Sequence, residues 1–243
     1  MTTVASGVDW TPYVPDIVRA AGVTLKFTVL GFAGAAGLGL VLALMRLSRR
    51  RIVRIPARIY IELFKNTPLL TQIFIIYFGL ASVGLILSPF VAGCLALALF
   101  YAAYLSEIFR GGIQGVNVGQ REAALAVGLA PQSMYRSVIL PQAVRLALPA
   151  TSNMLVDMLK STSLLAAIAG AELMTIARNV TSETFKALEV YLVIGGIYFL
   201  LAFPLSQGTA WYEKRLSQGK QFSLRKRRTR RHIASLVDVG VAK

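Results

Sequence analysis

The polar residues of greatest chemical interest lie in one apolar stretch of the chain. They are Asn153, Asp157, Lys160, Ser161, Thr162 and Ser163. The 4–3 spacing of the first three predicts that their side chains share one face of a helix. A charge at the centre of a bilayer costs ~2.5–3.5 kcal/mol on insertion scales, so such residues face the interior of a helix bundle and mark a pathway. We therefore expect these six residues to line a route for a zwitterionic or charged small molecule.

The alternative role for this face is structural. Asp157 and Lys160 are three residues apart and close enough on a helix to pair with each other. A self-satisfied pair of this kind would lock two helices together without lining any route. Both roles stay open at the level of sequence.

A second region with unusual composition lies between residues 117 and 141. An alanine-rich helix is predicted over 119–127, and Gly128 is suited to the left-handed position that follows a helix. Pro131 then opens a second helix, and Leu140-Pro141 closes it. The pattern predicts a compact helix–turn–helix.

Three residues of the first of these helices point to a contact surface. Glu122 is expected in the first turn, where a negative charge is favourable with the helix dipole. Ala123 and Ala124 give a surface of low relief that another protein can approach closely. The alternative is a small-residue hairpin that only packs beneath the rest of the protein.

Other kinds of site are excluded by residue counts. One cysteine, Cys94, and one histidine, His232, allow neither a disulfide framework nor a His or Cys cluster for a metal. No G-x-x-x-x-G-K-[ST] stretch occurs, so the chain has no P-loop. No carboxylates, histidines or cysteines are grouped for catalysis within the apolar stretches. We therefore predict that the chain is not an enzyme and has no metal or cofactor of its own.

The elements that carry these residues are membrane helices. Hydrophobic residues make up 56% of the 243 residues and charged residues 15%, against about 45–50% and 25% in soluble domains. Five stretches approach the ~20 apolar residues that a spanning helix needs. They are 23–46, 68–87, 89–109, 149–171 and 190–212. None shows the alternation of a membrane barrel, so we predict an all-α integral membrane protein with about five transmembrane helices.

The basic residues set the expected orientation. Six arginines lie between Arg46 and Arg58, and ten of the 26 basic residues follow Glu213. Both clusters directly follow apolar runs, which favours cytoplasmic charge beside a bilayer over a nucleic-acid site. With the loop 110–148 also basic, residues 1–20 are expected outside the cell and the tail 215–243 in the cytoplasm.

The stretch 56–87 is too long for one straight span. Asn66-Thr67-Pro68 is expected to break it. Residues 56–65 would then form an elbow at the inner surface, with Glu62 and Lys65 paired. A role in packing only is the alternative for this elbow.

Three further features are expected to have mainly structural roles. Small residues recur at every fourth position from Gly31 to Ala43, a pattern typical of close helix contact. Glu107 and Arg110 are expected to form a salt pair. The segment 172–189 is either an external docking segment or an ordinary solvated loop.

The hairpin resembles the EAA loop of ABC-transporter permease subunits. The family pattern is E-A-A, three residues, G, nine residues, I, one residue, L-P. The chain carries Glu122-Ala123-Ala124, Gly128 and Leu140-Pro141 in this register, with Val138 in place of isoleucine. The stretches 63–70, 107–114 and 159–164 are similar to the polar amino-acid uptake branch, to which opine permeases belong, although Ser161 stands where that branch often has aspartate. The resemblance covers roughly 20–215.

The resemblance implies a domain layout and a set of partners. Residues 21–214 would form the transmembrane permease domain, with a coupling loop over 117–141 that docks on a cytoplasmic ATPase dimer. ATP would be bound by that partner. A second permease chain would complete the pathway, and an external solute-binding protein would deliver the solute.

The expected function is therefore that of a permease subunit in the bacterial inner membrane. It would belong to an ABC importer of polar amino acids or opine-like derivatives. One alternative is a permease of the same architecture for another small solute. The other is a membrane scaffold that transports nothing and uses the loop for docking.

Overall fold

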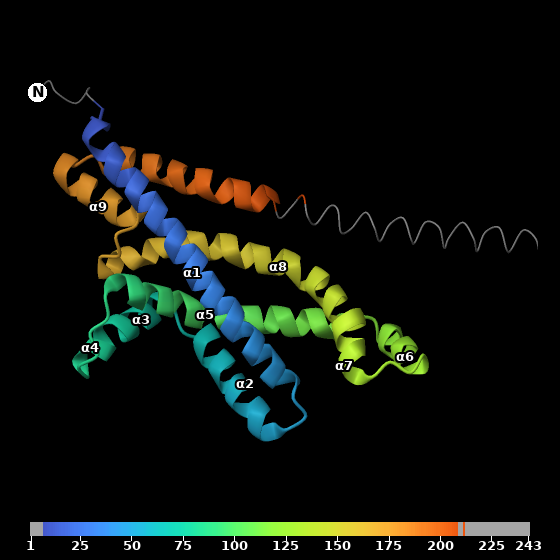
Figure 1. Ribbon diagram of the computed structural model, residues 1–243. Helices are drawn as coiled ribbons and strands as arrows, with labels where there is room; N and C mark the ends of the chain where they lie inside the picture. Colours follow the sequence, from blue (N-terminus) through green and yellow to red (C-terminus); the bar gives the residue numbers. More distant parts are fainter. Residues whose placement is uncertain (1–6, 209–210, 212–243) are drawn as a thin grey trace, which may run out of the picture.

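The computed structural model of the chain describes residues 7–208 and 211, and every regular element in these residues is helical. After a short 3-10 turn, η1 (Thr11–Tyr13), the long helix α1 runs over Val14–Leu47. It crosses obliquely over three helices that lie alongside one another: α5 (Pro89–Gln114), α8 (Leu140–Ser161) and the last helix, Ala187–Gly208 (Figure 1). The N-terminal part of α1 and the helix α9 lie at one end of the molecule, the α9 end. The helix α6 lies at the other, the α6 end.

The main core forms where α1, α5 and α8 meet. Phe27, Leu97 and Met158 are each 0% exposed. As predicted from the small-residue stripe, Gly39 of α1 allows close approach, since an added Cβ would lie 3.0 Å from Leu105 Cβ and 3.1 Å from the carbonyl oxygen of Ala102. The contact with α5 therefore depends on the missing side chain at this position.

Three helices in the described residues are long and apolar enough to cross a membrane. They are Thr11–Leu47, Pro89–Gln114 and Ala187–Gly208, and they overlap the predicted spans 23–46, 89–109 and 190–212, the last of which extends beyond the described residues. The predicted span 149–171 lies in a bent pair, Pro131–Ile168 and Leu173–Thr184, whose two parts meet at 50°. If that pair is one broken span, the structure has four.

The predicted span 68–87 is shorter than expected. It consists of α3 (Leu69–Phe74), a π-helical turn η2 (Ile75–Gly79) and α4 (Leu80–Ser82). At 1.5 Å per residue these elements span about 21 Å, against ~30 Å of hydrocarbon. Gly84, with φ of +89°, ends the helix early. The count of five spans therefore stays a prediction.

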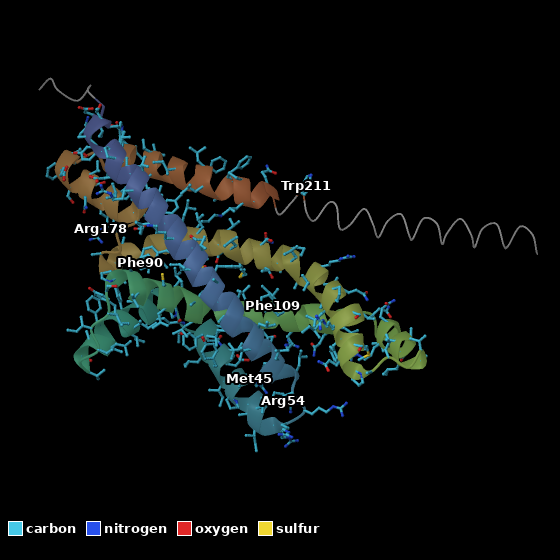
Figure 2. The ribbon with its side chains drawn as sticks, viewed as in Figure 1. Met45, Arg54, Phe90, Phe109, Arg178 and Trp211 are labelled. Atoms are coloured by element: carbon cyan, nitrogen blue, oxygen red, sulfur yellow. The ribbon has the colours of Figure 1, made fainter. Side chains whose placement is uncertain are left out.

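The expected elbow is a helix of its own, α2 (Arg51–Lys65), which begins five residues earlier than predicted. Its buried residues Ala57 and Ile61 pack toward α1 and α5, and Arg54 lies on an exposed side (Figure 2). The expected Glu62–Lys65 pair is wrong. Glu62 accepts a hydrogen bond from the Asn66 amide at 3.3 Å, while the Lys65 ammonium lies 5.5 Å from the centre of the Tyr104 ring.

The segment 172–189 is not a plain loop. It contains α9 (Leu173–Thr184), which joins α8 through a 3-10 helix, η4 (Thr162–Ile168). Leu173, Ala177 and Val180 of α9 form a second core with Val190 and Ile194 of the last helix.

Two predictions lie partly or wholly outside the described residues. They concern the start of the external segment 1–20 and the basic tail 215–243 with His232.

Candidate functional site

The predicted polar face of α8 forms as the 4–3 spacing indicated. Asn153, Asp157 and Lys160 are all exposed on this helix, and Leu164 lies exposed one turn beyond them. The helix carries Pro149 one turn before this face.

Asp157 is positioned by a tyrosine on the neighbouring helix. The Tyr101 hydroxyl of α5 lies 2.7 Å from Asp157 Oδ2 and 2.8 Å from Ser161 Oγ. A phenol has one proton, so it donates to the carboxylate and accepts from the serine. Because the Tyr101 ring is 1% exposed in the core, its hydroxyl is a fixed donor that orients the aspartate.

The alternative role of this face, a self-satisfied ion pair between Asp157 and Lys160, is not seen among the described residues. The salt bridges among residues 7–208 and 211 are Asp16–Arg19, Arg46–Glu107 and Glu107–Arg110. Asp157 instead takes the hydrogen bond from α5, while Lys160 faces the last helix. The two opposite charges therefore stand on one face without neutralising each other.

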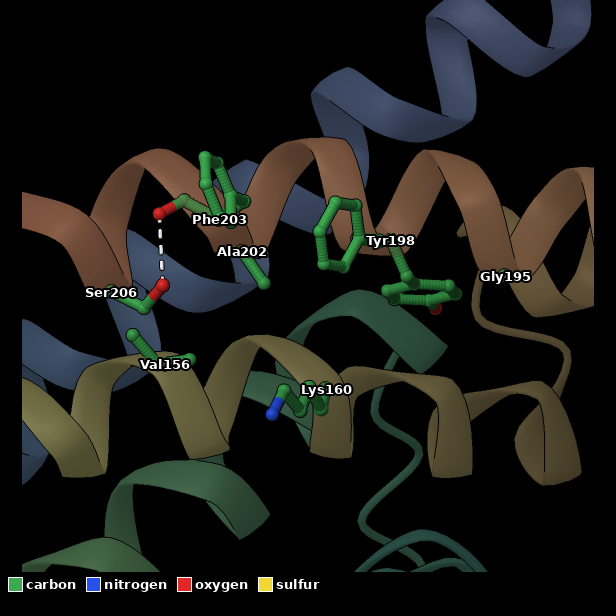
Figure 3. A pocket seen from close by; sticks show the side chains of 8 residues that line it. Val156, Lys160, Gly195, Tyr198, Ala202, Phe203 and Ser206 are labelled. Atoms are coloured by element: carbon green, nitrogen blue, oxygen red, sulfur yellow. Dashed lines mark hydrogen bonds between the residues drawn. The ribbon is translucent and has the colours of Figure 1, made fainter.

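Lys160 lies in a cleft between α8 and the last helix (Figure 3). Val156 and Lys160 form the α8 wall, and the opposite wall includes Tyr198, Phe199 and Phe203. The volume is about 320 Å³. An ammonium in mostly apolar surroundings attracts an anionic group or an aromatic face, so the cleft suits a ligand with a carboxylate.

The three consecutive hydroxyl residues have different partners. Ser161 reaches Tyr101, as described above. The buried Thr162 donates to the carbonyl of Leu159 at 2.7 Å, and Ser163 donates to the carbonyl of Lys160 at 2.8 Å. Ser161 and Thr162 therefore both reach another helix, since Thr162 also forms a side-chain hydrogen bond with Tyr198 of the last helix.

The hairpin at the α6 end begins as predicted. α6 runs over Val118–Ala126, and the Asn117 side chain caps it by accepting from Gly119 N at 2.8 Å. Gly128 has φ of +75°. The amide of Gly128 donates to the Leu125 carbonyl, and the amide of Leu129 donates to the Ala124 carbonyl. These two bonds make a Schellman ending, the geometry expected for glycine after a helix.

The three contact residues of α6 differ in their surroundings. Glu122 and Ala123 are exposed, but Ala124 is 5% exposed and packs with Met134 and Ile139. Glu122 does not lie in the first turn, because the helix begins at Val118. The expected pairing of Glu122 with the helix dipole is therefore wrong, as is the exposure of Ala124.

The second helix of the hairpin does not end at Leu140-Pro141. α7 (Pro131–Met134), a π-helical turn η3 (Tyr135–Ile139) and α8 follow one another without a break. A proline lacks the amide hydrogen and clashes with the carbonyl four residues earlier. The wider π turn before Pro141 removes this conflict. The second half of the hairpin and the polar face therefore lie on one continuous run of helix.

The predicted Glu107–Arg110 pair is present, and Arg46 joins it. Glu107 Oε2 accepts from Arg110 Nε at 3.0 Å, and Glu107 Oε1 lies 3.5 Å from Arg46 Nε of α1. This cluster ties α1 to α5 near the α6 end. In the part of the chain that the structure describes, no three His, Cys, Asp or Glu residues lie close enough together to hold a metal ion.

Sequence reasoning missed two residues that shape the site, Tyr101 and Tyr198. Each is a tyrosine in an apolar helix, and a buried phenol needs a hydrogen-bond partner. That requirement was a usable signal. The identity of the partner was not, because Asp157 lies 56 residues from Tyr101.

Comparison with known proteins assigns the family. Residues 35–218 match the family described as "Binding-protein-dependent transport system inner membrane component". The chain belongs to this family. Among its relatives is the octopine transport system permease of Rhizobium meliloti, 44% identical over an alignment of 216 residues that covers 82% of this chain and 88% of that protein. The probable glutamine ABC transporter permease of Bacillus subtilis is 37% identical over 195 residues, 80% and 90% of the two chains.

A solved structure agrees with this assignment. The crystal structure of an amino acid ABC transporter with histidines contains a chain that is 37% identical, with a TM-score of 0.81. The match covers 86% of this chain and 100% of the other. The present chain is thus a multi-pass inner-membrane permease of this family, whose members are transport components and not themselves enzymes.

Proposed function

We propose that this permease is the membrane subunit of an ATP-driven importer of polar amino acids or opine-like amino-acid derivatives. The observation that carries the proposal is the exposed pair of opposite charges, Asp157 and Lys160, which do not neutralise each other. An amino acid carries one ammonium and one carboxylate close together. The relatives of this permease include permeases named for amino acids, glutamine, octopine and nopaline, which favours this substrate class.

Each charged residue would take one end of the solute. Asp157, oriented by Tyr101, would accept hydrogen bonds from the ammonium. Lys160 would bind the carboxylate, and the cleft beside it would take a side chain. Asn153 and Ser161 would add neutral polar contacts. Thr162 and Ser163 would support the backbone of the route through their own hydrogen bonds.

ATP would act from outside the chain. We propose that α6, with Glu122 and Ala123 exposed, docks on a cytoplasmic ATPase dimer, which binds the nucleotide. The continuous helix from Pro131 to Ser161 supports a direct mechanical link. A displacement of α6 would pass through the short turn 127–130 to this helix and so move the α8 polar face.

Orientation and further partners belong to the same proposal. The α6 end and the basic tail would lie in the cytoplasm, and the N-terminus outside. Only 17% of the apolar window in the last helix is buried within the chain, so lipid and a second permease chain would cover the rest. An external solute-binding protein would meet the α9 end. A permease for another small solute, or a scaffold that transports nothing, is the remaining alternative.

The test is uptake by complexes reconstituted with the ATPase and the binding protein. Asp157→Asn and Lys160→Gln should each raise the half-saturating concentration of a transported amino acid by about tenfold, the factor that ~1.4 kcal/mol represents. Asp157→Asn should also reduce discrimination against the N-acetylated solute, which lacks the ammonium. Lys160→Gln should do the same for the amide, which lacks the carboxylate.

Matched controls carry the same substitutions at exposed sites of α1. Asp16→Asn and Lys26→Gln should leave both quantities unchanged. Normal abundance with unchanged uptake in both site variants would remove this face from the route. No uptake of any amino acid by the wild-type complex would favour another solute or the scaffold.

A further inference from the structure

The most deeply buried carboxylate of the described residues has no part in the proposed route. Glu172 is 0% exposed and lies between η4 and α9. Its carboxylate accepts from the backbone amides of Met174 and Thr175, both at 2.9 Å. It therefore caps the first turn of α9, where the helix dipole favours a negative charge.

The same carboxylate holds a residue of the cleft. Tyr198, on the last helix, donates its hydroxyl to Glu172 Oε2. Its ring forms part of the wall opposite Lys160 (Figure 3). One buried group thus connects the start of α9 with the side chain that borders the cleft.

Glu172 is itself rigidly placed. Arg178 of α9 donates to the Ala166 carbonyl of η4 at 2.8 Å, and the Thr175 hydroxyl donates to the Gly170 carbonyl. Figure 2 shows Arg178 at the α9 end. These bonds hold the bend between η4 and α9, so the position of Glu172 follows from the backbone around it.

We infer that Glu172 is a positioning residue that keeps the Lys160 cleft open by holding the Tyr198 hydroxyl. Without this bond the phenol loses its carboxylate acceptor and keeps only its contacts with the Thr162 hydroxyl and the Met174 amide, so the ring gains freedom to rotate. Because both residues line the same cleft, the freed ring would be drawn toward the Lys160 ammonium, a favourable partner for an aromatic face, and the cleft would close. This inference deepens the proposed function and rests on it for its effect on transport.

Two substitutions separate the hydrogen bond to Tyr198 from the helix cap. Glu172→Asp keeps a good capping residue but shortens the side chain by one methylene, so it caps α9 and no longer reaches Tyr198. Tyr198→Phe keeps the ring and removes the hydroxyl. Tyr191→Phe, at an exposed tyrosine two turns earlier on the same helix, is the matched control.

The first readout does not depend on transport. In a Cys94→Ala background, Val156→Cys, on the α8 wall of the cleft, is labelled with a maleimide in detergent-solubilised complex, so that the Lys160 ammonium stays in place. Glu172→Asp and Tyr198→Phe should each slow labelling by about tenfold, and Tyr191→Phe should not. Because both act on one bond, the double variant should be no slower than either single variant. Labelling at an unchanged or higher rate overturns the inference.

The second readout is uptake with the native Val156. Both variants should raise the half-saturating amino-acid concentration more than they lower the maximal rate, at normal membrane abundance. Loss of abundance in both would show a purely structural role and overturn the inference. If labelling slows as expected but the wild-type complex takes up no amino acid, the proposed function fails and the positioning role stands.

Discussion

At the residue scale, the hydrogen bond between Tyr101 and Asp157 sets the geometry of the α8 face. Tyr101→Phe keeps the ring in the core and removes the donor. We expect a stability loss of roughly 1 kcal/mol, the usual net value of one hydrogen bond. We also expect a raised half-saturating concentration, because the aspartate loses its orientation. Uptake kinetics and thermal unfolding of the complex measure the two effects.

The neighbouring tyrosine of α5 supplies the control. Tyr104→Phe keeps the ring beside Lys65 and should leave uptake unchanged. If Tyr101→Phe lowers stability but not apparent affinity, the orientation of Asp157 has no role in solute binding.

At the element scale, the ending of α6 depends on Gly128. A β-branched residue is strained at φ of +75°, whereas asparagine tolerates this region better. Gly128→Val should misplace α6, reduce co-purification of the ATPase and bring uptake near background, with normal membrane insertion. Gly128→Asn should be milder. Pull-down and uptake assays check this prediction.

The control for this prediction is a helical glycine. An added Cβ at Gly111 of α5 meets no other atom within 4 Å, so Gly111→Ala should behave like the wild type. Normal uptake by Gly128→Val would show that the hairpin does not transmit the movement and would favour the scaffold.

At the scale of the whole molecule, the prediction concerns which end faces the cytoplasm. The arginine-rich start of α2 and the hairpin both lie away from the α9 end, which carries few basic residues. A reporter fused after Gly119 should therefore read cytoplasmic, and one near Ser182 external. Phosphatase and fluorescent-protein fusions measure this. An external signal at 119 would contradict both the orientation and the coupling role of α6.

The sequence by itself determined the features that depend on residues within one or two turns. The apolar stretches, the face with Asp157 and Lys160, and the left-handed Gly128 follow from periodicity and local backbone preference. Pro141 shows the limit of such reasoning, because a local breaker was accommodated by the π turn before it.

The partner of each polar side chain, in contrast, depends on the tertiary structure. Asp157 bonds to Tyr101 and not to Lys160, and Glu172 is buried against Tyr198 although it reads as part of a surface segment. These partners lie 56 and 26 residues apart. Helix packing brings them together, and spacing along one helix carries no information about a donor on another. The cleft beside Lys160 exists for the same reason, since its two walls come from different helices.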